Sequence, residues 1–177
     1  MSEETRYQEL TRAVHAYGQA AMENLLRCRA LGLATSNGLA AYLGAPETCV
    51  ALVPAQGPFD PKRDYGHEAF SYDPLRPIRL EPIIFGLCVI VPNAEDSQSL
   101  WIRTGVRCEV IDERFEVFVA NQPMVRLPLE FEGQLEPLFE TLMREFMQIF
   151  RHELADFGDE RYRHQLGFVL TPTSEVR

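Results

Sequence analysis

Two histidines and several carboxylates lie within residues 150–164, FRHELADFGDERYRH, where they could bind a metal or exchange protons. Zinc sites on helices place two histidines four residues apart, as in HExxH. HELAD supplies only His152, and His164 lies beyond Gly158, a natural helix end. At about 100° per residue, His152 points away from the apolar stripe of its helix. The pattern favours the solvated end of a helix, and a metal or acid–base site using His152 and His164 stays as an alternative.

The segment 54–82 gathers the largest variety of functional side chains in one loop. It is rich in proline and has no clean period, and its aromatic residues indicate that it packs on the protein. His67 beside Glu68 could do acid–base chemistry, and Lys62 with Arg63 could hold an anion. No spacing matches a catalytic signature, so the simpler interpretation is that these charges pair and fix the loop. The side chains concerned are Lys62, Arg63, Asp64, Tyr65, His67, Glu68, Tyr72, Arg76 and Arg79.

A second candidate surface is the outward face of a predicted sheet. In LWIRTGVRCEVI, residues 100–111, apolar residues alternate with polar or aromatic ones, which places the two sets on opposite faces of a strand. Aromatic residues, methionine and arginine are enriched in protein–protein contacts. An ordinary polar face, with Glu109 and Glu116 neutralising the arginines, is the alternative. The side chains expected to share this face are Trp101, Arg103, Arg107, Phe118, Met124 and Arg126.

The composition excludes several classes of protein. The formal net charge is −9 and the pI is about 5.0, which disfavours nucleic acid as a partner, because phosphates repel an acidic chain. No apolar run is long enough to span a membrane, and the acidic start MSEETRYQEL does not resemble a signal peptide. We therefore expect a soluble, cytoplasmic protein. The four cysteines form no CxxC pair and lie in apolar stretches, so buried thiols are expected, and no metal or cofactor.

Two long amphipathic helices are predicted, one near each end of the chain. From Glu3 to Ala30 apolar residues recur at steps of three and four, and Gly32 is expected to close the helix. A short helical turn at NGLAAYL should follow. Residues 134–158 carry a stripe of Leu, Phe and Met that predicts packing on the core. The first helix carries a heptad-like seam that predicts packing on another helix, including that of a second copy; the seam begins with Tyr7, Leu10, Val14 and Tyr17.

Between the helices the pattern predicts a sheet. Strands are expected over residues 48–53, 83–91, 100–111, 114–120 and 124–129. A tight turn is expected at Asp112 and Glu113, and Pro128 should place the last strand at a sheet edge. The sequence thus predicts a single α+β domain over residues 1–177. Its antiparallel β-meander of four or five strands, mainly within residues 83–129, has the long N-terminal and C-terminal helices (1–32 and 134–158) packed on one face. Residues 159–177 form a tail.

At the level of architecture, a small acidic α+β chain with flanking helices resembles the secretion-chaperone type of fold, which dimerises and binds extended partners. The chain also lacks GxGxxG, GxxxxGK[ST] and GxSxG motifs. We expect a non-catalytic adaptor or chaperone-like protein, a homodimer that binds a protein partner through the open sheet face and the 54–82 loop. One alternative is a sensor of small anions, with the loop folded over Tyr65, His67 and Arg76. The other is a hydrolase or metal-dependent enzyme using His67 and Glu68, or His152 and His164.

Overall fold

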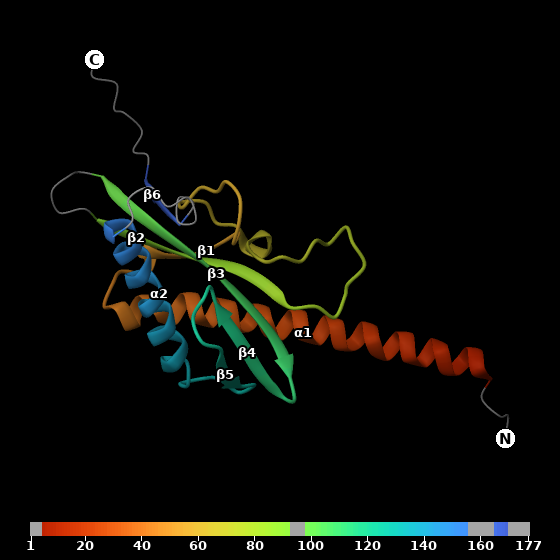
Figure 1. Cartoon of the computed structure of the whole chain (residues 1–177). Helices are drawn as coiled ribbons and strands as arrows, with labels where there is room; N and C mark the ends of the chain where they lie inside the picture. Colours follow the sequence, from red (N-terminus) through yellow and green to blue (C-terminus); the bar gives the residue numbers. More distant parts are fainter. Residues whose placement is uncertain (1–4, 93–97, 156–164, 170–177) are drawn as a thin grey trace, which may run out of the picture.

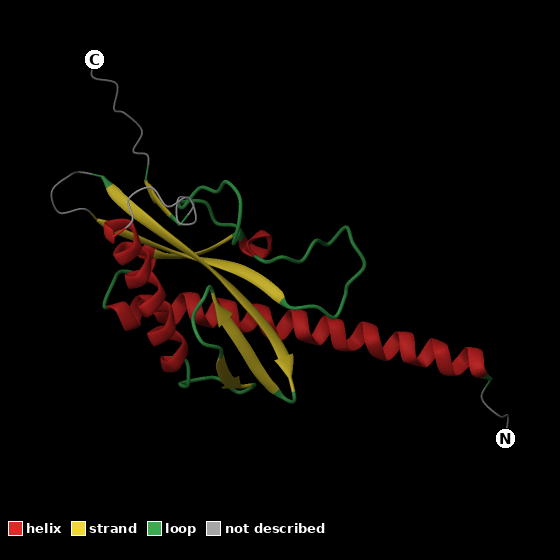
Figure 2. Cartoon of the chain, in the orientation of Figure 1, coloured by secondary structure: helices red, strands yellow, loops and turns green. Residues whose placement is uncertain are grey.

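The computed structural model describes residues 5–92, 98–155 and 165–169, and it has the predicted α+β architecture. Two helices pack on one face of an antiparallel sheet (Figures 1 and 2). The sheet has six strands in the order β1-β2-β3-β4-β5, with β6 paired to β3. The elements are α1 (Arg6–Leu43), β1 (Val50–Val53), β2 (Ile83–Pro92), β3 (Ser99–Ile111), β4 (Arg114–Val119), β5 (Val125–Pro128), α2 (Glu136–Ala155) and β6 (Leu166–Phe168), with short 3₁₀ turns at Glu47–Cys49 and Gly66–Ala69.

The central strand β3 organises the sheet. It has 13 residues and pairs with β2 from Ser99 to Cys108. On its other side, the C-terminal half pairs with β4 through the predicted tight turn, in which Asp112 and Glu113 have φ of 49° and 58°. The N-terminal half pairs with β6 from Leu100 to Ile102. The predicted tail therefore contains a short strand, Leu166–Phe168, that the sequence does not predict.

The core lies between the sheet and the two helices, and the predicted alternation along the strands is confirmed. Ile102, Val106 and Cys108 of β3 face the helices, as do the alternate residues of β4. Each of these strands has one apolar face, which packs on the helices, and one polar face. The helices fill the core with Leu25, Cys28, Leu31 and Leu39 from α1 and with Leu138, Leu142, Phe146 and Ile149 from α2.

Helix α1 is longer than the sequence predicts, because Gly32 does not end it. A Cβ at Gly32 would lie 2.8 Å from Cε1 of Phe70, so this glycine lets an aromatic ring pack against the helix backbone. The helix continues through NGLAAYL to Gly44, whose φ of 64° reverses the chain and whose N–H donates to Ala40 and Ala41. The predicted helix and the separate turn after it are therefore one element.

The N-terminal part of α1 extends beyond the sheet (Figure 1). From Arg6 to Ala20 every residue except Gly18 is exposed, whereas burial begins at Ala21, where the sheet starts. Thr5 begins the helix with a capping box, in which its hydroxyl accepts from the Gln8 amide and the Gln8 side chain accepts from the Thr5 amide. None of the helices in the described part of the chain combines the length and apolar composition needed to cross a membrane.

Candidate partner-binding surfaces

The loop that follows β1 covers part of the sheet face opposite the helices, and Arg103 holds it there. The guanidinium of Arg103 donates to the carbonyl oxygens of Pro54 at 3.1 Å and of Gly57 at 2.8 Å. It also lies 4.2 Å from the centre of the Phe59 ring. Only 5 % of Arg103 is exposed. A planar guanidinium suits this position because it can donate along its edge and stack on its face.

Burial under this loop also sets the electrostatics of Cys88, the register partner of Arg103 on β2. Burial raises the pKa of the Cys88 thiol to about 12, although the nearby positive charge of Arg103 acts to lower it. The same desolvation lowers the pKa of Arg103. The pair is therefore a neutral thiol beside a hydrogen-bonded cation, and Cys88 does not have the lowered pKa of a nucleophilic cysteine.

Trp101 is also covered rather than displayed on an open face. Its ring packs edge-on against Phe59, with the ring centres 4.7 Å apart and the planes at 76°. On β6, Gly167 lies so close to the Trp101 ring that any side chain there would overlap it. Trp101 and Arg103 are therefore separated from the other four residues predicted to share the outward face. The sequence could not show this, because the covering segments come from elsewhere in the chain.

The part of the outward face that stays open lies over β2 to β5. Strand register places Ile84, Arg107 and Phe118 in one row across three strands. Arg107 is exposed and lies 4.3 Å from the centre of the Phe118 ring. In the next row, Arg126 forms an ion pair of 3.2 Å with Glu116. This open face has the predicted aromatic and arginine character over a smaller area, and its charges are partly neutralised within the sheet.

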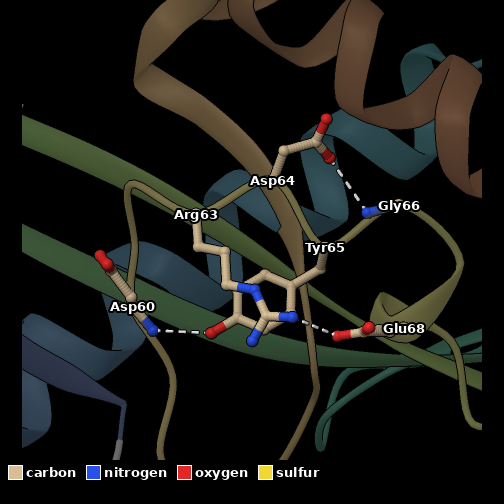
Figure 3. Close-up of polar contacts among 6 residues, drawn as sticks. All are labelled: Asp60, Arg63, Asp64, Tyr65, Gly66 and Glu68. Carbon is tan, nitrogen blue, oxygen red and sulfur yellow. Dashed lines mark hydrogen bonds and ion pairs between the residues drawn. The ribbon is translucent and has the colours of Figure 1, made fainter.

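Several functional groups of the 54–82 loop contact one another (Figure 3). The Tyr65 hydroxyl accepts a hydrogen bond of 2.8 Å from the Asp60 amide. Arg63 donates to Glu68 at 2.6 Å and lies 4.6 Å from the centre of the Tyr65 ring. Glu68 is therefore paired with Arg63 and not with His67. These contacts support the simpler interpretation, in which the side chains of the loop pair with one another and fix its shape, for Arg63, Tyr65 and Glu68.

The same loop forms one wall of an open hollow of about 490 Å³ beside β1. We call it the β1 groove. Among the described strands, β1 has a neighbour on one side only, namely β2. Lys62 is exposed at the rim and forms no ion pair with any residue in the described part of the chain. The groove is lined by Leu33 and Ser36 of α1, Val50, Ala51 and Leu52 of β1, and Pro61 to Asp64 of the loop, among others.

Of the three residues expected around a bound anion, Arg76 borders a hollow in the described part of the chain that Tyr65 and His67 do not border. Arg76 borders a separate hollow of about 320 Å³, together with Tyr72, Arg79 and four other residues. It also forms an ion pair of 3.4 Å with Asp73. The structure thus places residues of the predicted loop site at the β1 groove and at a second hollow, which Arg76 and Arg79 line together with Asp73 and Glu81.

Helix α2 carries a polar cluster that the sequence analysis missed. Glu145 is only 3 % exposed, and its carboxylate accepts a hydrogen bond of 2.9 Å from the Gln122 side chain. The same Gln122 amide nitrogen donates to Gln148 at 2.6 Å, and Gln148 contacts His152 at 3.2 Å. The predicted stripe is therefore rotated: Met143 and Met147 are exposed while Glu145 is buried.

The metal alternative involves His152 and His164. His152 lies beside Gln148, whereas His164 and Asp156 lie outside the described residues. Within the described ranges, no group of three or more His, Cys, Asp or Glu side chains is arranged to hold a metal ion. Comparisons with protein-family models, with curated proteins and with solved structures find no match.

Proposed function

We propose that this protein is a non-catalytic protein-binding module that acts as a homodimer and holds an extended segment of a partner in the β1 groove. The observation that carries the proposal is strand β1, which pairs with only one other described strand and is bordered by an open hollow. Such an edge presents unpaired backbone groups to which an extended peptide can add as another strand. The open sheet face, with Arg107 and Phe118, is a second contact area for a larger partner.

The side chains of the groove indicate what kind of segment it accepts. Apolar residues of α1 and β1 suit alternate apolar side chains of a bound strand, because successive side chains point to opposite faces. Lys62 at the rim suits an acidic side chain, whereas the charge of the neighbouring Arg63 is paired with Glu68. The partner segment is therefore an extended peptide that combines apolar and acidic residues.

Selection from a displayed library of random peptides tests this function with the whole chain. We expect enrichment of peptides that alternate apolar residues with Asp or Glu, and amide NMR shifts at Val50–Val53 when such a peptide is added. Lys62→Glu should weaken binding about tenfold, as expected for the loss and reversal of one charge contact. Arg144→Glu on α2 makes the same change of charge away from the groove and should have little effect.

The outcomes separate the parts of the proposal. Failure to enrich any peptide above background would overturn peptide binding as the function. Shifts at Arg107 and Phe118 instead of β1 would overturn the groove and assign binding to the open face.

A sensor of small anions is the second candidate, because Arg76 and Arg79 line one hollow with the hydroxyl-bearing Tyr72. Thermal unfolding in the presence of a panel of phosphates and carboxylates tests it. A rise in melting temperature that is lost in Arg76→Ala with Arg79→Ala supports a sensor, and no rise with any anion overturns it.

A further inference from the structure

The projecting part of α1, from Arg6 to Ala20, carries an apolar seam that is largely exposed, although Tyr17 is half-covered and accepts a hydrogen bond from the Leu80 amide. Helices with an apolar stripe ordinarily bury it against another element. Here the exposed fractions are 79 % for Tyr7, 65 % for Leu10, 71 % for Val14 and 48 % for Tyr17. The seam lies on the same side of α1 as Ala21 and Leu25, which pack on the sheet further along the helix.

We propose that this seam binds the same segment of a second copy in antiparallel orientation. The spacing of the seam is self-complementary: Tyr7 and Tyr17 have residue numbers that sum to 24, and so do Leu10 and Val14. In an antiparallel pair centred at position 12, Tyr7 therefore lies opposite Tyr17 of the partner subunit, and Leu10 lies opposite Val14 of the partner subunit. Every apolar side chain of the seam meets another, as a twofold contact requires.

The position of the sheet selects the antiparallel orientation over the parallel one. From Ala21 onward the seam side of α1 is occupied by the chain's own sheet. A parallel partner would bring both sheets into the space between the two helices, at the same end. In an antiparallel pair the partner's sheet instead lies beyond the N-terminal end of the first helix. The two projecting segments can then overlap along their full length.

The residues beside the seam are compatible with close packing. Thr11, Ala13, Gly18 and Ala20 flank it, and all four are small and uncharged. A Cβ at Gly18 would find no atom within 4 Å in the single chain, so this position is open to a neighbour. Arg6 also flanks the seam. The antiparallel pairing places it opposite Gly18 of the partner subunit, whereas a parallel pairing would place it beside a second Arg6.

An open hollow lies where the partner helix would end. It measures about 340 Å³ and is lined by four apolar residues and four polar or charged ones, namely Ala20, Leu80, Val110 and Leu129, and Glu23, Asn24, Arg27 and Glu113. Leu80 is held there because its amide donates to the Tyr17 hydroxyl at 3.0 Å. The partner helix begins at Arg6, opposite Gly18, about one helical turn before this hollow. The contact can thus continue from the seam onto the body of the protein.

This inference rests on the homodimer of the proposed function and specifies how the dimer forms. Light scattering and sedimentation of the full chain over a range of concentrations should show a dimer. Leu10→Glu with Val14→Glu should raise its dissociation constant about 100-fold or more, because charges replace four apolar side chains per dimer. Ala16→Glu with Gln19→Glu adds the same charge on the opposite side of the helix and should leave dimerisation unchanged. Unfolding curves of both variants confirm that the body is folded.

Disulfide trapping tests the orientation, in a background with Cys49→Ser so that this half-buried thiol does not react. A mixture of the Tyr7→Cys and Tyr17→Cys proteins should cross-link, since these positions lie opposite each other. Either variant alone should not, because like positions lie about 15 Å apart along an antiparallel pair.

Efficient self-linking of Tyr7→Cys would show a parallel dimer and overturn only the orientation. A dimer that persists in Leu10→Glu with Val14→Glu would place the interface elsewhere. A monomer in every condition would overturn both this inference and the homodimer, leaving peptide binding to its own test.

Discussion

Arg103 and Cys88 are register partners on adjacent strands, and both are buried on the face of the sheet that lies away from the helices. Arg103 ties this face to the loop after β1, through the carbonyl oxygens of Pro54 and Gly57. The loop that forms one wall of the β1 groove is therefore anchored by a residue of the central strand. Substitutions at Arg103 should therefore lower the stability of the fold. They should also change the shape of the groove, because the loop that forms its wall loses this anchor.

Replacing Arg103 with Met should lower the free energy of unfolding by about 2–4 kcal/mol, because two part-buried hydrogen bonds to the loop and the stacking on Phe59 are lost. The stability of Arg103→Lys should fall between those of the wild type and Arg103→Met. An ammonium cannot both donate along an edge and stack on Phe59, as a planar guanidinium does. Chemical denaturation measures both. Arg107→Met, on the open face of the same strand, is the matched control and should change stability by about 0.5 kcal/mol or less. Equal losses at Arg103 and Arg107 would contradict the anchoring role.

The raised pKa of Cys88 predicts a loss of stability at alkaline pH. The thiol stays protonated in the folded protein up to a pKa of about 12, whereas the ordinary value is 9.0. The unfolded chain therefore releases this proton first as the pH rises. The contribution to stability is complete below about pH 9 and decreases toward pH 12, by up to about 1.4 kcal/mol per pH unit.

Urea unfolding at several values between about pH 8 and about pH 10.5 tests this dependence. The difference between wild type and Cys88→Ala isolates the thiol, because other groups that titrate in this range are common to both. The wild type should lose stability more steeply with rising pH than the variant. Parallel curves would show that Cys88 titrates alike in the folded and unfolded chains.

Two glycines of α1 should respond to alanine in opposite ways. Ala is favoured over Gly inside a helix by about 1 kcal/mol, and at Gly18 there is open space for the new methyl group. At Gly32 the methyl group would lie 2.8 Å from Phe70, which itself packs on Phe85. We expect Gly18→Ala to be neutral or stabilising, and Gly32→Ala to destabilise by about 1–3 kcal/mol. Thermal unfolding of both variants gives the comparison, and a stabilising Gly32→Ala would mean that the ring moves freely.

The features that the sequence predicted correctly depend on neighbours close in the chain. Alternation along residues 100–120, a two-residue turn and the edge position of Pro128 follow from local pattern and produce β3, β4 and β5. The features that it missed depend on distant contacts. Gly32 resembles a helix end until Phe70 is seen packed against it.

The candidate surfaces also combine features that the local sequence predicts with features that depend on distant contacts. The residue types of the 54–82 loop predicted a binding site there, but only the fold shows that Lys62 lines the β1 groove. Alternation placed Arg103 correctly on the outward face of β3, yet it could not show that Pro54 and Gly57 cover it. Burial of a polar side chain by a remote segment leaves no periodic signal in the sequence.

Gln122 and Glu145 should be energetically coupled, because a buried carboxylate without its donor is costly. Gln122→Ala should lower the free energy of unfolding by about 1–3 kcal/mol. In a double-mutant cycle with Glu145→Ala, the coupling energy should be about 0.5–3 kcal/mol, as for residues in direct contact. Glu140→Ala, an exposed carboxylate on the same helix, is the control and should be additive with Gln122→Ala. Additive losses for Gln122 and Glu145 as well would mean that their 2.9 Å hydrogen bond contributes little to the fold.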